Sequence, residues 1–416
     1  MSIATIERLN PFLPKVTSDP YTHYRRYREQ DPVHWGISSN PNLSGAWYIF
    51  RYEDVMKVME DRRFGREFVK REDVETTPVP TAYQTFLTMV SNWIVFREPP
   101  DHTRLKSLVS KAFTPKVVEN LRPVVYEIAD SLLDQVHARG EMDLVEEYAF
   151  PLPIMVIATM LGANPHDHPL FRQWALALQN ASASRLKPPP ETYEKAEKAS
   201  QEFIDYFKPI IANRRANPQE DLISNLVKAA DESDKLTDEE IVATCTHLLT
   251  AGHETTVNLI AKGVIALLQN PQAYKLLRSH PELTPNAIEE IIRYDTPIQM
   301  ITRWAYADIE IGGQLIKRGD SVGIMLGSAN RDPARFQNPE VFDIQREDIK
   351  HCGFGGGIHY CLGSTLARAE GQIAINVLLN RLPELRLVNE NIDWANNIIF
   401  HGPNNLPVAF TKPVGV

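Results

Sequence analysis

The sequence predicts one large unit that is mainly α-helical and has a minor β-sheet region. Four long stretches, 117–138, 191–214, 238–269 and 362–381, place apolar residues three and four positions apart, as amphipathic helices do. Only short β-like pieces occur outside them. No alternation of strands and helices of dinucleotide-fold length is present, which argues against a doubly wound parallel sheet.

The β-like pieces are separated from one another along the chain by the long helical stretches, except for the second and third. The first, "AWYIF" (46–50), precedes all four long helical stretches. The next two, "IEIGGQLI" (309–316) and "DSVGIML" (320–326), resemble a hairpin with a Gly-Gly turn. The last, "LPVAF" (406–410), follows the final helical stretch. We expect these pieces to form a small sheet region beside a helical core.

Composition excludes several classes of protein. The 416 residues are 43% hydrophobic and 23% charged, which is ordinary for a globular chain. A net charge of −9 with interspersed acids and bases does not predict a nucleic-acid binder. Three cysteines, Cys245, Cys352 and Cys361, are too few for a disulfide framework. They fit a reducing cytoplasm, where we expect the protein to be.

Nothing in the sequence predicts secretion or a membrane span. The start lacks a basic region followed by an apolar core. The longest apolar run, "FPLPIMVIATMLGA" (150–163), contains two prolines and is shorter than the roughly 20 residues that a span requires. The proline-rich "KPPPE" (187–191) predicts a loop between helices that is too short to separate domains. We therefore expect a soluble protein.

Residues 353–363, "GFGGGIHYCLG", place one thiol behind several glycines, and four kinds of site could use it. A dinucleotide phosphate cradle needs glycine at its sixth position, where this segment has Ile358. A zinc site built from Cys352, His359 and Cys361 lacks a Cys-x-x-Cys pair and a fourth ligand. A cysteine nucleophile would have His359 nearby as a base, but no third group to orient that base.

The fourth kind of site fits the local physics best. Cys361 directly precedes the amphipathic stretch 362–381, and the amides and dipole at a helix N-terminus lower the pKa of a thiol. Three consecutive glycines upstream let the backbone pass close to a bulky group. A thiolate that faces a large flat partner is typical of the axial ligand of a haem.

The segment "FGGGIHYCLG" (354–363) resembles the haem-binding signature of the cytochrome P-450 family. Phe354, Gly357, Cys361 and Gly363 occupy the fixed positions of that signature. The resemblance implies that Cys361 is the axial ligand of the haem iron. It also implies that Phe354, Gly355 and Gly363 lie against the haem.

A second segment, "AGHETT" (251–256), resembles the oxygen-activating helix of the same family. The resemblance implies that Thr255 offers a hydroxyl to bound oxygen and that Glu254 relays protons. We expect Ala251 and Gly252 to leave space for dioxygen against the helix. A zinc-protease His-Glu-x-x-His motif is excluded because position 257 is Val.

A third segment, "EIIR" (290–293), resembles the Glu-x-x-Arg helix of the family. A spacing of three places Glu290 and Arg293 on one helix face, where they can form an ion pair. The resemblance implies that a later arginine, Arg346, joins them. We expect this triad to support the cysteine segment rather than to take part in catalysis.

A fourth segment, "REPPDHTRLKSLVSKAF" (97–113), resembles the helix that holds the haem propionates. His102 and Lys106 occupy the family's propionate-binding positions. The family usually has Arg where this chain has Lys106, which keeps the charge and loses the bidentate geometry. The resemblance implies that Arg303 and His359 are the other propionate partners.

The four segments occur in the family's order, and looser similarity extends over the whole chain. The resemblance therefore implies the cytochrome P-450 fold, an all-helical core around haem, in one domain over residues 1–416. It implies that the β-rich part comes from about the first 60 residues and from segments near 300–326 and 398–412.

The implied activity is that of a monooxygenase with haem b as cofactor and O2 as co-substrate. One oxygen atom would enter a small hydrophobic substrate such as a polyketide, macrolide, fatty acid or terpenoid. Peroxide-driven hydroxylases and decarboxylases usually lack the acid–threonine pair that is present here as Glu254 and Thr255. An intact oxygen-activating segment also argues against a haem sensor without catalytic activity.

The implied partners supply electrons and substrate. No flavin or nicotinamide fingerprint occurs, so electrons are expected from a separate ferredoxin or flavodoxin and an NAD(P)H-dependent reductase. Arg104, Lys106, Lys111 and Lys116 could form the docking patch for that partner. The chain resembles bacterial enzymes that hydroxylate polyketides and a branch that cleaves carrier-bound acyl chains for biotin synthesis. We expect a monomer whose substrate is free or bound to a carrier protein.

The substrate cavity is expected to be mostly apolar. His247 lies one helical turn from Ala251 and two from Thr255 on the same face. It could anchor a polar or carboxylate group of the substrate, or be a buried histidine bonded to a backbone carbonyl. Segments 65–93 and 187–191 resemble the family's mobile lids. The residues that we expect to line the cavity are Ile94, Val95, His247, Ile298, Gln299, Ile301 and Phe400.

Overall fold

The computed structural model describes residues 6–40, 42–67, 81–182, 189–233 and 236–412. The helices are α1 (Pro14–Thr17), α2 (Pro20–Gln30), α3 (Tyr52–Glu60), α4 (Gln84–Ser91), α5 (Asp101–Val109), α6 (Pro115–Val136), α7 (Pro151–Leu161), α8 (His168–Ser182), α9 (Pro190–Ala216), α10 (Leu222–Ser233), α11 (Asp238–Gln269), α12 (Pro271–Ser279), α13 (Thr284–Tyr294), α14 (Leu326–Ala329) and α15 (Ser364–Arg381). The strands are β1 (Val33–Gly36), β2 (Ala46–Ile49), β3 (Phe64–Gly65), β4 (Glu141–Asp143), β5 (Ile301–Ala305), β6 (Ile309–Ile311), β7 (Gln314–Ile316), β8 (Ser321–Ile324), β9 (Arg386–Leu387) and β10 (Pro407–Ala409).

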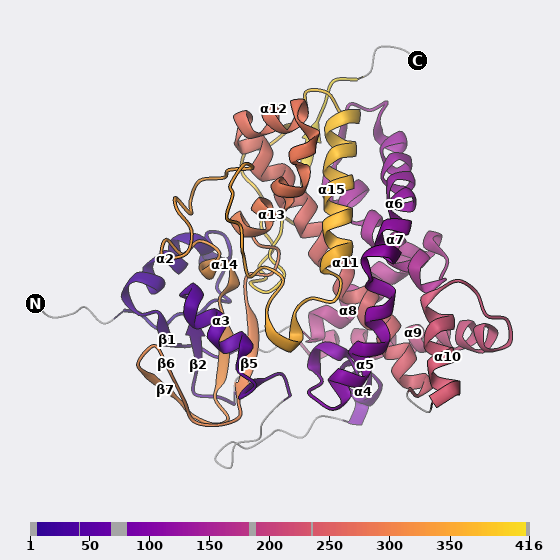
Figure 1. The fold of residues 1–416 in the computed structure, drawn as a ribbon, viewed down its shortest axis with the longest axis horizontal. Helices are drawn as coiled ribbons and strands as arrows, with labels where there is room; N and C mark the ends of the chain where they lie inside the picture. Colours follow the sequence, from indigo (N-terminus) through magenta and orange to yellow (C-terminus); the bar gives the residue numbers. More distant parts are fainter. Residues whose placement is uncertain (1–5, 41, 68–80, 183–188, 234–235, 413–416) are drawn as a thin grey trace, which may run out of the picture.

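All four predicted long helices are present, as α6, α9, α11 and α15. Helix α11 has the predicted bounds because its start is strongly encoded. The Thr237 side chain accepts from the Glu240 amide while the Glu240 side chain accepts from the Thr237 amide, which forms a capping box. Acidic residues fill the first turn, where the helix dipole favours negative charge. This helix runs through the middle of the molecule (Figure 1).

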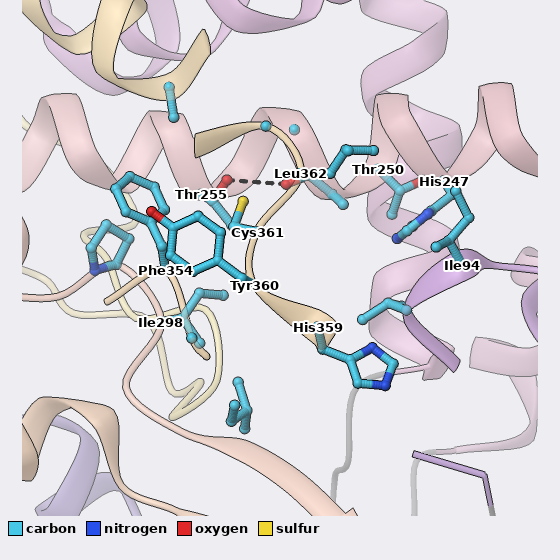
Figure 2. A pocket seen from close by; sticks show the side chains of 18 of the residues that line it. Ile94, His247, Thr250, Thr255, Ile298, Phe354, His359, Tyr360, Cys361 and Leu362 are labelled. Carbon is cyan, nitrogen blue, oxygen red and sulfur yellow. Dashed lines mark hydrogen bonds between the residues drawn. The ribbon is translucent and has the colours of Figure 1, made fainter. Parts of the chain in front are cut away.

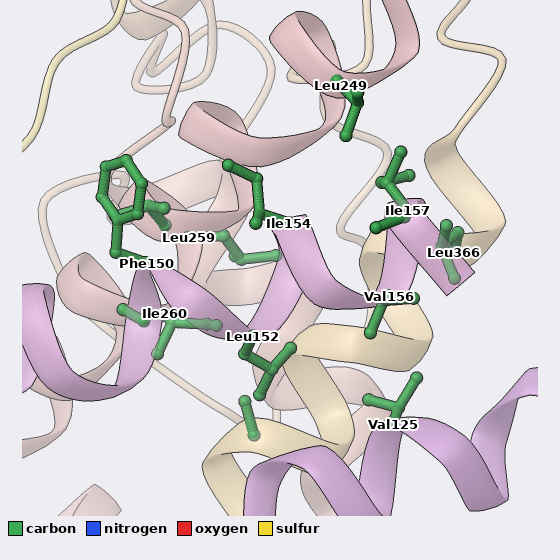
Figure 3. Close-up of a cluster of buried hydrophobic side chains, with 14 of the residues drawn as sticks. Val125, Phe150, Leu152, Ile154, Val156, Ile157, Leu249, Leu259, Ile260 and Leu366 are labelled. Carbon is green, nitrogen blue, oxygen red and sulfur yellow. The ribbon is translucent and has the colours of Figure 1, made fainter. Parts of the chain in front are cut away.

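The hydrophobic core is centred on α7, the apolar run 150–163 of the sequence. Helix α7 is buried along almost its whole length and packs against α6, α8 and α11, while α15 packs against α6 and α11. Burial on all sides explains why this helix has no polar face. Figure 3 shows the cluster in which its side chains meet those of the neighbouring helices: Val125, Phe150, Leu152, Ile154, Val156, Ile157, Leu249, Leu259, Ile260 and Leu366.

The largest sheet and the β6-β7 hairpin lie at one side of the helical part, next to α2 and α3 (Figure 1). The largest has the strand order β1-β2-β8-β5-β3, in which β2 and β8 are parallel and the other neighbours are antiparallel. A second sheet has the order β4-β10-β9. The predicted pieces 46–50 and 406–410 thus supply β2 and β10.

The predicted hairpin between 309–316 and 320–326 is wrong in its pairing. The Gly-Gly turn joins β6 to β7, so both arms of the hairpin lie within 309–316. Gly312 and Gly313 have φ values of 53° and 77°, as a tight hairpin turn with the twist of the strands requires. Strand β8, from the second piece, pairs with β5 and β2 instead.

Candidate functional site

A cavity of about 400 Å³ lies between the middle of α11 and the loop that precedes α15. The floor is formed by the cysteine loop, which we define as residues 352–363. Strand β5, helix α8 and the short 3-10 helix η2 (Ile94–Phe96) contribute further walls. The cavity therefore brings together segments that the sequence separates by more than half of the chain (Figure 2).

The cysteine loop holds Cys361 at the cavity. The amide of Cys361 donates to the carbonyl of Phe354 at 2.9 Å, and the amide of Gly355 donates to the carbonyl of Cys352 at 2.8 Å. The Cys361 side chain is open to the cavity although it lies deep inside the molecule. Burial raises the pKa of its thiol, while the amide of Gly363 at the start of α15 and the charges of Arg368 and Lys106 act in the opposite direction.

The glycines of the cysteine loop serve two different contacts. Gly355 lines the cavity with a φ of 73°, and the nearest atom to the place where a Cβ would be is the His359 carbonyl oxygen at 3.8 Å. Gly357 has a φ of 62°, but a Cβ there would lie 2.4 Å from the carbonyl oxygen of Met59 in α3. The expectation that consecutive glycines only allow close passage to a bulky cofactor is thus incomplete, since Gly357 is needed for packing on α3.

The opposite wall is one face of α11, where His247, Ala251 and Thr255 all line the cavity as their spacing predicts. The Thr255 hydroxyl donates to the carbonyl of Ala251 at 3.0 Å. Gly252 also lines the cavity, but a Cβ there would lie 3.2 Å from Ile157 Cδ1, so this glycine additionally lets α7 approach. Glu254 is half-buried on α11 and is not part of the cavity wall.

Basic side chains gather at one end of the cavity. Arg303 of β5, His102 of α5 and His359 of the cysteine loop all line it, and the rings of His102 and His359 lie 4.5 Å apart. The His359 Nε2 is 3.0 Å from Glu98 Oε1. Burial lowers the pKa of Arg303 to about 10 and that of His102 to about 4. This end of the cavity therefore favours an anion that would stabilise the arginine charge.

Arg66, which the sequence analysis missed, belongs to the same end of the cavity. Its guanidinium lines the cavity and donates to the carbonyls of Val95 and Thr302. Burial and the nearby charge of Arg303 lower its pKa to about 9. A single arginine after a short strand carries no sequence signal of its own, because only the fold brings Arg66 next to Arg303.

Lys106 of α5 contacts the cysteine loop. It lines the cavity, but its Nζ donates to the carbonyls of Ile358 at 2.5 Å and Tyr360 at 3.1 Å. Lysine can make such point contacts with carbonyl oxygens, whereas the planar fork of arginine suits a carboxylate. Lys106 therefore ties α5 to the cysteine loop, and its contact with a propionate stays a prediction.

The predicted triad is brought together behind the cysteine loop. Arg293 donates to both Glu290 oxygens at 2.7 and 2.8 Å, and the Arg346 Nε donates to Glu290 Oε2 at 3.1 Å. The side chains of Glu290 and Arg293 are fully buried. Arg293 also donates to the carbonyls of Asn330, Pro339 and Val341, so the triad fixes the segment that leads into the loop.

One residue of the expected cavity lining is wrong. Gln299 is fully buried on the other side of the chain, where its Nε2 donates to the Tyr21 hydroxyl at 2.9 Å and to the Thr296 carbonyl at 2.9 Å. Ile298 and Gln299 are neighbours in an extended segment, so their side chains point in opposite directions. The expected residues that do line the cavity are Ile94, Val95, His247, Ile298, Ile301 and Phe400.

The sequence analysis also missed polar residues of the cavity wall, among them Trp93, Gln179 and Glu370. Glu370 of α15 accepts a hydrogen bond from the Thr256 hydroxyl at 3.3 Å, and burial raises its pKa well above the usual range. An acidic residue within an apolar stretch of a predicted helix is a signal that could have pointed to Glu370. Trp93 and Gln179 have no comparable signal in the sequence.

The alternative uses of Cys361 find no support in the geometry. No three His, Cys, Asp or Glu side chains gather as a metal site would need within the described residues. The His359 ring pairs with Glu98 and is turned away from Cys361, so it is not placed as a base for a cysteine nucleophile (Figure 2). Cys352 is buried, and its amide donates to the Asn330 side chain.

The four residues of the predicted docking patch differ in their exposure and pairing. Arg104 forms an ion pair with Glu240 of α11 at 2.5 Å and another with Asp101, while Lys111 and Lys116 are exposed. The predicted lids at 65–93 and 187–191 lie partly outside the described residues, which omit 68–80 and 183–188. Within the described part of 65–93, Trp93 reaches the cavity.

The residues present fit a haem. Such a cofactor needs an axial thiolate, an anion-binding end for its propionates and apolar walls for its faces. Cys361 is open to the cavity, and Phe113 and Leu362 are apolar residues of its wall. Among the described residues, fewer carboxylates than arginine charges lie next to Arg66 and Arg303. The carboxylates of bound propionates would raise the pKa of both arginines and so stabilise their charged form.

Comparison with known proteins gives a consistent result. A sequence profile described as Cytochrome P450 matches residues 44–384. The polyketide biosynthesis cytochrome P450 PksS of Bacillus subtilis (strain 168) is 38% identical over 95% of this chain and 96% of its own length. The biotin biosynthesis cytochrome P450 of the same organism is 39% identical over 99% of this chain and 100% of its own.

A solved structure extends the comparison to three dimensions. The crystal structure of P450BioI in complex with hexadec-9Z-enoic acid ligated acyl carrier protein has a TM-score of 0.88, at 38% identity. The match covers 95% of this chain and 99% of that one.

Among the described residues, no helix of this chain has the length and apolar character needed to cross a membrane.

Proposed function

The chain belongs to the cytochrome P450 family of haem-thiolate monooxygenases, and from this premise we propose which of its residues bind the haem and which take part in the reaction. Members of the family insert one atom of dioxygen into an organic substrate. When bound, the haem supplies the redox chemistry of oxygen activation. The proposed axial ligand of its iron is Cys361, and the observation that carries this proposal is a thiol open to the cavity beneath α11.

Four side chains would position the haem by binding its propionates. Arg66, Arg303, His102 and His359 offer donors to the propionates at the basic end of the cavity. Lys106 would hold the cysteine loop against α5 through the carbonyls of Ile358 and Tyr360. Phe354, Gly355 and Gly363 would lie against the haem beside the thiolate.

Thr255 and Glu254 would deliver protons to the oxygen side of the cavity. The Thr255 hydroxyl now donates to the Ala251 carbonyl, and rotation of the side chain would let it donate to bound oxygen instead. Glu254 precedes it on the same helix and is half-buried, so it could exchange protons with solvent. Ala251 and Gly252 leave the wall next to Thr255 without bulky side chains.

The electron donors would be a separate ferredoxin or flavodoxin with its NAD(P)H-dependent reductase. Bacterial members of the family use such redox partners. The exposed Lys111 and Lys116 support an acidic partner near α5, whereas Arg104 is already engaged with Glu240 and Asp101. The substrate would be a small hydrophobic molecule, free or on a carrier protein, since one structural neighbour was solved with an acyl carrier protein. The protein is expected to act as a monomer.

The absorption spectrum of the reduced protein with carbon monoxide tests the axial ligand. Thiolate ligation predicts the red-shifted Soret band that is characteristic of this family, and Cys361→Ala should abolish it. Cys352→Ala is the matched control, because Cys352 is in the same loop but is buried away from the cavity. A red-shifted band that survives in Cys361→Ala would overturn the assignment.

A further inference from the structure

Lys262 is a charged residue in the apolar second half of α11. Its side chain is fully buried, and its neighbours along the helix, 259–261 and 263–267, are buried and are either apolar or glycine. Lys262 does not line the cavity. A buried ammonium group is costly unless it is paired and hydrogen-bonded, so its partners show what this lysine is used for.

Both partners of Lys262 lie where α13 ends and the chain turns toward β5. The Nζ donates to Asp295 Oδ1 at 2.8 Å and to the carbonyl of Thr296 at 3.0 Å. Within the described ranges, no other charged side chain bonds to Asp295. The Tyr21 hydroxyl of α2 also donates to Asp295 Oδ1, at 2.8 Å, so the carboxylate is shared between α11 and α2.

The cavity side of this region is apolar. We call residues 295–301 the wall segment. Figure 2 shows its Ile298 in the same space as Thr255 and Cys361. The side chains of this segment would therefore contact a substrate that is held near Thr255. The residues of the wall segment that line the cavity are Pro297, Ile298, Met300 and Ile301.

The opposite side of the wall segment is held by polar bonds at Thr296, which is fully buried. Its hydroxyl accepts from Asn330 Nδ2 at 3.0 Å, and its carbonyl accepts from Gln299 Nε2 at 2.9 Å as well as from Lys262. Of these three donors, Lys262 is the one that belongs to α11. Its two bonds therefore tie the wall segment to the helix that carries Thr255.

Stability alone does not account for a lysine at this position. Taking an ion pair out of water costs about as much as the attraction returns, so an apolar pair of similar size often stabilises a fold equally well. What the pair adds is geometry, because bonds of 2.8 and 3.0 Å fix two atoms of the wall segment relative to α11. Thr255 lies seven residues before Lys262, so two helical turns, roughly 10 Å, separate this anchor from the Thr255 hydroxyl.

We infer that Lys262 is a positioning residue for substrate selection, which acts from outside the cavity. By binding Asp295 and the Thr296 carbonyl, it keeps the wall segment at a set distance from α11 and so fixes the width of the cavity between Ile298 and Thr255. The inference rests on the proposed function, because the substrate is taken to lie between α11, the wall segment and the haem.

Two ligands of the haem iron that differ in size test the inference in the haem-loaded protein. Imidazole binds through a ring nitrogen and does not extend far from the iron, whereas 4-phenylimidazole carries a phenyl group that must fit between α11 and the wall segment. Both dissociation constants are read from the shift of the Soret band. The readout is the ratio of the two constants, which cancels a change in the iron–nitrogen bond.

Lys262→Met removes the charge and keeps a side chain of similar length. We expect the ratio to shift against 4-phenylimidazole by about tenfold, because wall side chains that are no longer held in place must be ordered by the ligand. Arg214→Met is the matched control: it also leaves a buried carboxylate, Asp221, without its ion-pair partner, but neither residue lines the cavity. This control should lower stability and leave the ratio within about twofold of the wild type.

A double variant separates positioning from a loss of stability. Lys262→Met leaves the mostly buried Asp295 carboxylate without its bonded cation. Lys262→Met/Asp295→Asn removes that charge but does not restore the bond to the Thr296 carbonyl. We expect its thermal stability to recover toward the wild type while the ratio stays shifted. The double variant also gives the answer if Lys262→Met alone does not load haem.

The outcomes separate this inference from the proposed function. A ratio within about twofold of the wild type in Lys262→Met or in the double variant would overturn the inference, and so would an equal shift in Arg214→Met. If instead the wild-type protein lacks the thiolate-type carbon monoxide band, the proposed function itself fails. A normal band in every variant shows that the shifted ratio does not come from a misfolded haem site.

Discussion

Gly357 shows how a single residue can be required for two reasons. Its φ of 62° is strained for any other residue, and a Cβ would lie 2.4 Å from the Met59 carbonyl oxygen. Gly313 has a similar φ of 77° with no atom within 4 Å of a Cβ, so it isolates the backbone cost. We expect Gly313→Ala to cost about 1 kcal/mol and Gly357→Ala distinctly more, measured as thermal stability together with haem content.

Equal stability losses in Gly313→Ala and Gly357→Ala would contradict this prediction. Equal losses in the two variants would mean that α3 yields to the new methyl group. The cysteine loop would then not depend on close contact with Met59.

The Thr255 hydroxyl is expected to couple electron transfer to product formation. Removing its hydroxyl in Thr255→Ala should leave reductant consumption largely intact but lower the yield of oxygenated product per electron pair roughly tenfold or more, with peroxide released instead. Thr255→Ser keeps the hydroxyl and should retain most of the coupling. The measurement is the ratio of product and peroxide to NAD(P)H oxidised, and wild-type coupling in the alanine variant would exclude the role.

Single residues also show which features of the site could be predicted from the sequence and which could not. The spacing of His247, Ala251 and Thr255 was sufficient to place all three in the cavity wall, because helix periodicity alone fixes a shared face. Gln299 was misplaced because the direction of a side chain in an irregular extended segment depends on the contact of Ile298 with Phe400, which is far away in the sequence. Arg66 was missed for the same reason: its partners come from other segments.

Between elements, the triad of Glu290, Arg293 and Arg346 connects α13 to the segment before the cysteine loop. Arg293→Ala would leave the Glu290 carboxylate buried without its main partner, which costs about 3–5 kcal/mol. Arg335→Ala breaks the pair with Asp348 in the same segment, and Asp348 is largely exposed, so we expect the loss of stability to be much smaller than in Arg293→Ala.

Thermal unfolding and haem content of the two variants measure this difference. We expect Arg293→Ala to purify with little haem or none, and Arg335→Ala to be close to the wild type. A stable, haem-loaded Arg293→Ala protein would show that the triad is dispensable for the cysteine loop.

Elements differed in how well the sequence predicted them. The long helices were predicted nearly to their ends because each repeats the same local pattern over many turns. Two of them, α6 and α11, also begin at a side-chain cap, Thr114 and Thr237. The strands are only two to five residues long, so their pairing is decided by contacts across the fold. That is why the Gly-Gly turn was recognised while the partner of β8 was not.

Across the whole molecule, buried histidines make stability depend on pH. Burial lowers the pKa of His253 to about 3, with a further contribution from Arg172, and lowers that of His401 to about 4. Both stay uncharged in the folded protein, while in the unfolded chain they bind a proton near pH 6.5. The unfolded state therefore binds more protons at acid pH, and stability falls as the pH drops from about 6.5 toward 4.

His253→Leu should remove one part of this acid sensitivity. Each such histidine contributes a slope of about 1.4 kcal/mol per pH unit between the unfolded and folded pKa values, so the variant should lose less stability than the wild type between pH 7 and 5. The measurement is the urea midpoint of helix loss at both pH values, with His166→Leu as the control because His166 is exposed. His253 makes no hydrogen bond among the described residues, so its replacement should cost little at pH 7. An equal fall in the midpoints of the wild type and of His253→Leu would mean that the ring gains a proton inside the fold.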